Sequence, residues 1–245
     1  MTRQDGRTFD QMRPVTIETG YLKYPHGSAL IAFGDTKVIC TVTVDEKVPP
    51  FLLSRPQPQG WLTCEYALMP AAGLSRNQRA GYGNTTVKGR VHEIQRMVGR
   101  ALRAAIDLKK VGSRTLQIDC DVLQADGGTR TASVTGAMVA LEIAVNKLMA
   151  EGKITENPLL TRVAAVSVGL HQGNVLLDLD YKEDSAAETD LNIVMTSEGG
   201  FIEVQGTAEK GVFSAAQLSD MLKLGETGIK RLFELQTKAI ERARR

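Results

Sequence analysis

Three β-hairpin patterns constrain the fold of this chain most. Each consists of two short apolar or β-branched runs separated by a short turn rich in polar residues or glycine. The six runs are residues 28–33 and 36–44, 163–170 and 174–180, and 191–196 and 201–205. Short turns join antiparallel strands, whereas a parallel pair needs a crossover of a dozen or more residues. The hairpins therefore disfavour a doubly wound parallel sheet.

Helical periodicity alternates with these hairpins. Apolar residues at helical spacing predict a helix over residues 88–108 and a second from about 129 to 149. A third begins near Ser214, a favourable N-cap, and we expect Gly225 and Gly228 to interrupt it.

Three further segments read as strands, and two as loops. The strands are residues 15–22, 61–68 and 116–122, and the loops are residues 46–59, which contain four prolines, and 70–86. The sequence therefore predicts an α+β fold in which mixed β-sheets pack with helices. Both halves run from hairpins to a helix, which suggests duplicated β-β-α units.

Composition excludes several classes of protein. The chain has 245 residues, of which 42% are hydrophobic and 24% charged, as in ordinary soluble proteins. Its three cysteines are too few and too scattered for a disulfide framework, and the polar N-terminus lacks the apolar core of a signal peptide. No apolar run approaches the roughly 20 residues of a membrane span. We therefore expect no membrane association, a reducing compartment and a cytoplasmic location.

The basic residues are concentrated in one part of the chain. Residues 76–114 contain ten Lys and Arg but two acids, although the net charge of the whole chain is only +2. Such asymmetry indicates a polyanionic partner at one surface, and a solvated helix face is the alternative. Within the predicted helix, Arg96 lies opposite the apolar face, whereas Arg90 lies at its edge in the first turn.

The segment from Asp126 to Ser133 resembles an anion site. Gly127 and Gly128 end a strand pattern, and Thr129 and Arg130 begin a helix. The first turn of a helix has unpaired N–H groups and positive partial charge, and Arg130 adds a forked donor. The segment is neither GxxxxGK[ST] nor GxGxxG, so nucleoside triphosphate binding is not supported. An ordinary capped glycine turn is the alternative.

An acidic cluster follows the second hairpin. In an extended strand Asp178 and Asp180 would share one face, and Asp184 would return beside Asp178 after a short turn. Two carboxylates near a phosphate site suit Mg²⁺. A solvated acidic turn is the alternative. The three histidines form no HxH or HxxxH pair and no serine lies in GxSxG, which disfavours zinc hydrolysis and covalent catalysis.

Many motifs in this order resemble the ribonuclease PH family of bacteria. They run from the first residues to the C-terminal helix and leave no room for a further domain, so we expect one ribonuclease PH domain over residues 1–245. The motifs are Arg3-x-Asp5-Gly6-Arg7, Met12-Arg13-Pro14, Gly34-Asp35-Thr36-Lys37-Val38, Gly60-Trp61-Leu62-Thr63-Cys64-Glu65-Tyr66, Gly89-Arg90-x-x-Glu93-Ile94-Gln95-Arg96, Gly127-Gly128-Thr129-Arg130-Thr131-Ala132-Ser133, residues 183–190 and Glu203-Val204-Gln205-Gly206-Thr207.

The resemblance implies a fold, an activity and an assembly. The fold is the ribonuclease PH fold, of the ribosomal protein S5 domain 2 type, shared with polynucleotide phosphorylase and the exosome core. The activity is removal of nucleotides from RNA 3′ ends, chiefly of tRNA precursors, with inorganic phosphate as co-substrate and nucleoside 5′-diphosphates as products. The assembly is a homohexameric ring built as a trimer of dimers.

The resemblance also implies roles for individual residues. The phosphate-binding positions fall on Arg90, Gly128, Thr129 and Arg130. The catalytic and metal-binding aspartates, which would hold Mg²⁺ or Mn²⁺, fall on Asp178 and Asp184. RNA-binding arginines fall on Arg76 and Arg79, and the place of Arg96 on the basic helix face adds it to the expected RNA-binding residues.

Two features depart from the family pattern, Ala71 and the loop of residues 73–86, and Met12 replaces the usual leucine as a conservative core exchange. Ala71 stands where the family usually has an arginine that helps to hold tRNA. Two other functions remain open from the sequence: a non-catalytic RNA-binding ring subunit of an exosome-like assembly, and a hydrolytic metal nuclease. The first would lack part of the phosphate and aspartate set, and the second would need a denser set of metal ligands.

Overall fold

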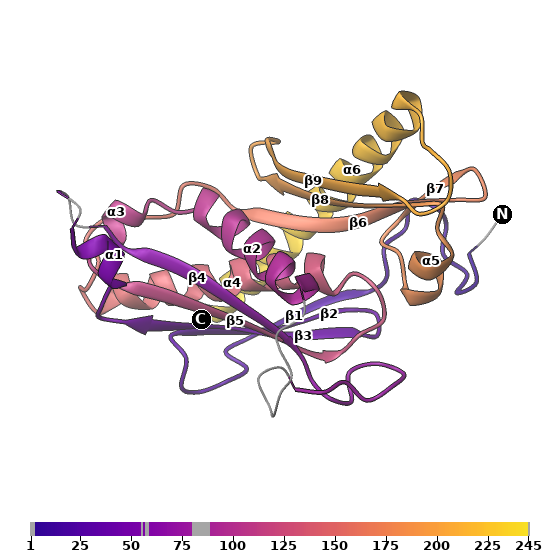
Figure 1. Cartoon of the computed structure of the whole chain (residues 1–245). Helices are drawn as coiled ribbons and strands as arrows, with labels where there is room; N and C mark the ends of the chain where they lie inside the picture. The colour runs from indigo at the N-terminus through magenta and orange to yellow at the C-terminus, as the bar shows by residue number, and fades with distance from the viewer. Residues whose placement is uncertain (1–2, 55, 57–58, 80–88, 245) are drawn as a thin grey trace.

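A computed structural model of the chain describes residues 3–54, 56, 59–79 and 89–244 and has two β-sheets with helices between and beside them (Figure 1). The larger sheet has five strands in the order β1-β2-β3-β5-β4. Its strands are β1 (Val15–Thr19), β2 (Gly27–Phe33), β3 (Thr36–Asp45), β4 (Trp61–Leu68) and β5 (Thr115–Gln124). Neighbours are antiparallel except β4 and β5, which are parallel.

The smaller sheet is wholly antiparallel and has the order β7-β6-β8-β9. Its strands are β6 (Val163–His171), β7 (Asn174–Leu177), β8 (Thr189–Thr196) and β9 (Phe201–Ala208). The predicted hairpins and the α+β class with mixed sheets are thereby confirmed. Because the sheets differ in strand number and in the parallel pair, duplication of a β-β-α unit stays a prediction.

Helix α4 (Thr129–Ala150) lies between the sheets and contacts strands of both. It is buried on nearly all sides, which explains why small and aliphatic residues occupy its whole circumference. By length and composition α4 resembles a membrane span, but 78% of its apolar stretch is buried inside the fold, as in the core helix of a soluble protein.

Two long helices cover the outer parts of the core. Helix α2 (Gly89–Ala104) packs on β4, and α6 (Ala215–Ala243) packs on β6, β7 and β1 (Figure 1). Three short helices complete the described chain: α1 (Pro50–Leu53), α3 (Leu108–Val111) and α5 (Tyr181–Ala186).

Helix α6 corrects one prediction. It begins after the predicted N-cap Ser214, whose hydroxyl accepts a hydrogen bond from the Gln217 amide, but Gly225 and Gly228 do not interrupt it. A Cβ at Gly225 would lie 2.4 Å from Ile193, and one at Gly228 would lie 2.8 Å from Leu177. The two glycines therefore allow the helix to approach the sheet closely.

The other differences concern segment ends. The predicted helix over 88–108 ends at Ala104, and α3 is separate; the predicted loop over 46–59 contains α1. The predicted strand over 15–22 ends at Thr19. Lys88 and the part of the predicted loop beyond residue 79 lie outside the described residues. The thiols of Cys40, Cys64 and Cys120 are buried and form no disulfide.

Candidate active site

A cavity of about 840 Å³ opens where the two sheets meet α2, the start of α4 and α5. Its lining combines residues from distant parts of the chain and contains both signs of charge. The charged lining residues are Arg90, Glu93, Arg130, Asp184, Asp190, Glu209 and Lys210.

The Gly127-Gly128 turn forms one wall of this cavity. Gly127 and Gly128 have φ values of +77° and +66°, which glycine adopts without the steric cost of a Cβ. A Cβ at Gly127 would also lie 2.6 Å from the Leu179 carbonyl oxygen, so the segment before α5 packs directly on the turn. This contact places the start of α4 beside α5.

The same turn is fixed from its other side by β3 and the N-terminal segment. The Thr36 hydroxyl donates to the Gly127 carbonyl at 2.6 Å and accepts from the Asp126 amide at 2.9 Å. Arg13 donates to the carbonyls of Asp126 and Gly127. These hydrogen bonds support the backbone at the start of α4.

Thr129 and Arg130 occupy the first turn of α4, as predicted, and both line the cavity with Gly128. The Tyr66 hydroxyl lies 2.8 Å from the Thr129 hydroxyl. Burial raises the pKa of Tyr66, although the Thr129 hydrogen bond and the charges of Arg90 and Arg130 oppose that shift. Tyr66 therefore stays neutral in this environment and supports Thr129 from β4.

Arg90 reaches the cavity from the first turn of α2, so the structure brings it together with the start of α4. Arg130 is held from two sides. Its Nη1 donates to Gln205 Oε1 at 2.9 Å and to Glu93 Oε1 at 3.4 Å. The two arginines face a common space lined by the N-terminus of a 22-residue helix.

Asp184 also faces this space. It lies in the first turn of α5, which begins with a capping box between Asp180 and Glu183. Burial raises the pKa of Asp184, the nearby Asp190 carboxylate raises it further, and the charges of Arg90 and Arg130 oppose the shift. Asp184 therefore keeps a proton to higher pH than an exposed aspartate.

Asp178 lies outside the cavity, and its position shows that the predicted strand over residues 174–180 was too long. Strand β7 ends at Leu177, and Asp178 has a φ of +55°, so Asp178 and Asp180 do not alternate along a strand. Asp178 is 1% exposed and is absent from the cavity lining. Both of its carboxylate oxygens accept hydrogen bonds from Arg13. The structure thus brings Asp190, which the sequence did not single out, into the cavity beside Asp184.

The N-terminal arginines were also missed as functional candidates. Arg3, Arg7 and Arg13 are buried against the segment that carries Asp178 and Glu183. Arg3 donates to the carbonyls of Leu177 and Asp178, and Arg7 also donates to that of Asp178. These bonds fix the backbone that leads into α5. Their signal in the sequence is their place in two of the family-like motifs, Arg3-x-Asp5-Gly6-Arg7 and Met12-Arg13-Pro14, which carried no assigned role.

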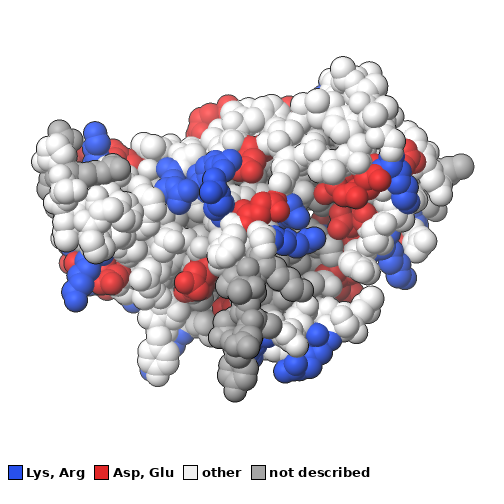
Figure 2. Space-filling model, in the orientation of Figure 1, with Lys and Arg blue, Asp and Glu red and all other residues white. Residues whose placement is uncertain are grey.

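The predicted RNA-binding arginines come from two elements, helix α2 and the loop after β4. Arg96 is exposed on α2, and Figure 2 shows a group of basic side chains over that helix. Arg76 is exposed in the loop after β4, whose neighbours Ser75 and Asn77 line the cavity. Arg79 lies near Asp121 of β5: burial raises the pKa of Asp121, and the charge of Arg79 opposes that shift.

The lining has the charge pattern of a site for phosphate groups and a cation. It contains three cationic and four acidic residues, so an added anion requires a counter-cation or a proton. Carboxylates such as Asp184 and Asp190 fit Mg²⁺, which uses one or two protein carboxylates and completes its shell with water and substrate phosphates. In the part of the chain that the structure describes, no group of three or more His, Cys, Asp or Glu residues is arranged to hold a metal.

Comparison with known families identifies two matching profiles. Residues 11–145 match domain 1 of the 3′ exoribonuclease family, and residues 161–228 match domain 2. Among curated proteins, ribonuclease PH of Bacillus pumilus (strain SAFR-032) is 52% identical over 235 residues, which cover 96% of each chain.

Two solved structures share the fold at low sequence identity. Rice (Oryza sativa) Rrp46 has a TM-score of 0.79 at 20% identity and covers 98% of this chain and 100% of its own. The Archaeoglobus fulgidus exosome with RNA bound to the active site has a TM-score of 0.77 at 23% identity and covers 95% of this chain and 92% of the matched one.

Proposed function

The chain belongs to the 3′ exoribonuclease family, and we propose that it uses inorganic phosphate to shorten RNA from its 3′ end, releasing nucleoside 5′-diphosphates. The observation that carries this proposal is the cavity in which Arg90, Thr129 and Arg130 face Asp184. The arrangement provides a site for an attacking anion opposite a carboxyl group whose pKa is raised.

The first requirement of phosphorolysis is to bring two anions together. Inorganic phosphate must approach the phosphorus of the last internucleotide linkage, and both groups are negatively charged. The unpaired N–H groups at the start of α4, with Arg90 and Arg130, supply donors for the attacking phosphate. Each charge-assisted hydrogen bond is worth about 1.5–3 kcal/mol.

The second requirement is to stabilise the leaving 3′ oxygen of the shortened RNA. Asp184 is the candidate general acid because burial and Asp190 raise its pKa. Mg²⁺ or Mn²⁺ is part of the proposal: the Asp190 carboxylate would hold it while Asp184 keeps the proton that it donates, and Asp184 would join as a ligand only after that proton has left. When bound, such a cation supplies electrostatic stabilisation of phosphate oxygens.

The predicted second metal ligand, Asp178, has a different place in this proposal. Its two oxygens already accept hydrogen bonds from Arg13, so metal binding there would leave the buried guanidinium without its partner. We assign Asp178 to holding the glycine turn and the start of α5 through Arg13.

The substrate and assembly belong to the same proposal. We infer that the substrates are the 3′ ends of tRNA precursors and other RNAs, that the chain forms a homohexameric ring built as a trimer of dimers, and that it works in the cytoplasm. The basic surface of α2, including the exposed Arg96, supports binding of an RNA backbone. Sedimentation of the purified chain tests the ring, and competition between tRNA precursors and unstructured RNA tests the substrate.

One assay tests the reaction itself. RNA with an accessible 3′ end is incubated with the full chain, with and without inorganic phosphate, and the products are separated by chromatography. We expect nucleoside 5′-diphosphates that appear only with phosphate. Nucleoside monophosphates formed at the same rate without phosphate would indicate hydrolysis instead, and no product under either condition would indicate the non-catalytic ring subunit.

A further inference from the structure

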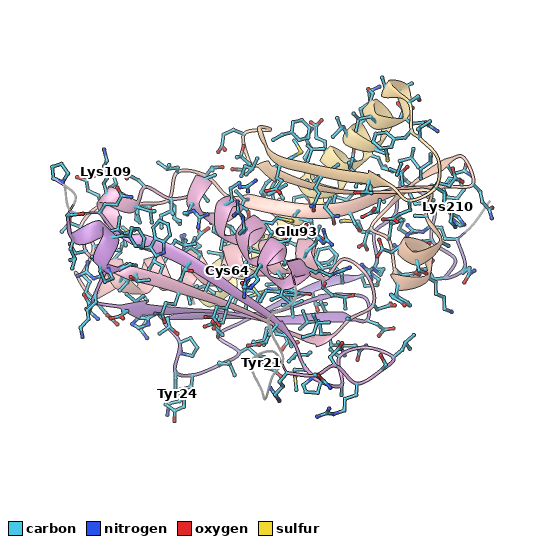
Figure 3. All side chains as sticks on the ribbon, viewed as in Figure 1. Tyr21, Tyr24, Cys64, Glu93, Lys109 and Lys210 are labelled. Carbon is cyan, nitrogen blue, oxygen red and sulfur yellow. The ribbon has the colours of Figure 1, made fainter. Side chains whose placement is uncertain are left out.

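Arg130 is held by residues from two other elements of the fold. Its Nη1 donates to Gln205 of β9 at 2.9 Å and to Glu93 of α2 at 3.4 Å. Gln205 Nε2 in turn donates to Glu93 Oε1 at 2.5 Å. Figure 3 shows Glu93 on the side of α2 that faces the smaller sheet. The three side chains therefore form a closed ring of hydrogen bonds where α2, α4 and β9 meet.

The ring uses only one nitrogen of the guanidinium. Among the described residues, Arg130 Nη2 and Nε donate no hydrogen bond, and Arg130 lines the cavity. A guanidinium fixed through one nitrogen keeps a pair of donors in the plane that a phosphate group requires. The contacts of Nη1 thus leave Nη2 and Nε available as donors to a ligand in the cavity.

The restraint on the Arg130 side chain matters because two carboxylates lie nearby. Asp184 and Asp190 also line the cavity, and a long arginine side chain that is free to move would pair with them. Among the described residues, Arg130 forms no ion pair with either aspartate, and its side chain is only 16% exposed. Holding Nη1 on the side of α2 and β9 keeps Arg130 away from the carboxylates that the reaction needs.

We propose that Glu93 and Gln205 are positioning residues that clamp Arg130 so that its remaining donors meet the incoming inorganic phosphate. The inference rests on the proposed function and deepens it. Gln205 is suited to the clamp because its amide accepts from Arg130 and donates to Glu93, which a carboxylate at this position could not do.

Steady-state kinetics of the full chain test the clamp. Phosphate is titrated with a short single-stranded RNA held at saturation, and RNA affinity is measured separately without phosphate. We expect Glu93→Ala and Gln205→Ala each to raise the KM for phosphate about fivefold, which corresponds to about 1 kcal/mol, because Arg130 loses one anchor. The kcat at saturating phosphate and the RNA affinity should change less than about twofold.

Two further variants test whether the effect on the KM for phosphate comes from positioning of Arg130, from the charge of Glu93, or from a general loss of contacts between β9 and α2. Glu93→Gln keeps an oxygen that accepts from both partners, so it should return the KM to within about twofold of the wild type. Glu203→Ala is the matched control, because Glu203 also joins β9 to α2, through Arg100 at 3.1 Å, without contacting Arg130. This control should leave the KM for phosphate unchanged.

The outcomes distinguish this inference from the proposed function. A wild-type rate that is independent of phosphate would refute both. Phosphate dependence in the wild type with an unchanged or lower KM in Glu93→Ala would refute only the clamp, and a lower KM would mean that Glu93 competes with phosphate for Arg130. A KM in Glu93→Gln as high as in Glu93→Ala would also refute the positioning role. Thermal unfolding of each variant confirms that the fold is retained.

Discussion

Arg13 donates from Nη2 to Oδ1 of Asp178 at 2.6 Å and from Nε to Oδ2 at 2.9 Å, and both side chains are almost fully buried. Burial alone would lower the pKa of Arg13, but its hydrogen bond with Asp178 and the charge of that carboxylate raise it. Arg13 also donates to the carbonyls of Asp126 and Gly127. The pair therefore connects the N-terminal segment, the segment after β7 and the turn at the start of α4.

Removal of the Arg13–Asp178 ion pair is expected to lower the free energy of unfolding. Asp178→Asn removes the carboxylate that binds the buried Arg13 most closely and leaves Asp126, at 4.0 Å, as a weaker counter-charge. Removal of one partner from a buried ion pair costs about 3–5 kcal/mol. We predict a loss of that size in the free energy of unfolding, measured by urea denaturation at pH 7.

Asp5→Asn is the matched control for that prediction. Asp5 also pairs with a buried arginine, Arg7, but its side chain is 38% exposed, and such pairs contribute less than about 1 kcal/mol. Equal losses in Asp178→Asn and Asp5→Asn would show that burial gives the Arg13 pair no special weight.

The geometry of the candidate anion site was predictable from the sequence because its parts are adjacent in the chain. The turn at Gly127 and Gly128, the start of α4 and the side chain of Arg130 lie within four residues. Helix N-termini and glycine turns are determined by local conformation, so a short motif identifies them. Arg90 was predictable for a related reason, since helical periodicity placed it at the edge of the apolar face.

The remaining contacts join residues that are distant in the sequence and have no periodic signal. Arg13 and Asp178 are 165 positions apart, and Glu93 and Gln205 are 112 positions apart. The spacing of Asp178 suggested a strand residue beside Asp184, but the positive φ at Asp178 turns the chain and buries that carboxylate. Asp190 enters the cavity because β8 begins beside α5, which only the topology reveals.

Asp184→Asn is expected to abolish turnover while the fold is retained. The amide can neither donate a proton as a carboxylic acid does nor bind a divalent cation strongly, and loss of a general acid costs about 10²–10⁴-fold in rate. Phosphorolysis of short RNA at saturating phosphate and Mg²⁺ measures the loss. A rate close to that of the wild type would make Asp184 an ordinary residue of the cavity wall.

The same substitution should stabilise the protein at neutral pH. Because the pKa of Asp184 is raised in the folded state, the wild type loses stability as pH rises from the ordinary aspartate pKa of about 3.9 through the raised value. Asp184→Asn does not undergo this loss. Thermal unfolding is measured over a pH series with a chelator present. The variant and the wild type should be equally stable below about pH 3.9, and the variant should become increasingly more stable than the wild type as pH rises above that value. A difference in stability that is the same at all pH values would contradict the raised pKa of Asp184.

Arg90→Ala and Arg130→Ala are expected to impair the use of phosphate more than the binding of RNA. Each variant removes a charge-assisted donor from the anion site, so the KM for phosphate should rise about tenfold or more, while RNA affinity falls less than about twofold. Arg231→Ala serves as the control, since Arg231 lies on α6 and contacts the Asp10 carbonyl. A large loss of RNA affinity with unchanged phosphate dependence would place these arginines on the RNA surface instead.

Arg96→Ala tests the basic surface of α2. If the exposed Arg96 contacts an RNA phosphate, its loss should weaken binding of every single-stranded RNA and reduce the slope of log affinity against log salt by about 0.7. Lys230→Ala is a suitable control, because Lys230 is exposed on α6 and pairs with Glu226. Affinity is measured by fluorescence anisotropy over a salt series, and an unchanged slope in Arg96→Ala would remove this residue from the RNA surface.

Ala71→Arg is expected to increase affinity for tRNA. Ala71 is exposed just after β4, two residues before Gly73, which lines the cavity, so a new arginine there would lie near the cavity. One added phosphate contact should steepen the slope of log affinity against log salt by about 0.7–0.9, whereas Ala71→Gln, which has a long side chain without charge, should leave the slope unchanged.

Because several subunits of a ring would offer their loops to one tRNA, the gain in tRNA affinity from Ala71→Arg should be larger in the assembled form than in dilute, dissociated protein. Equal gains in both forms would mean that one subunit binds tRNA on its own.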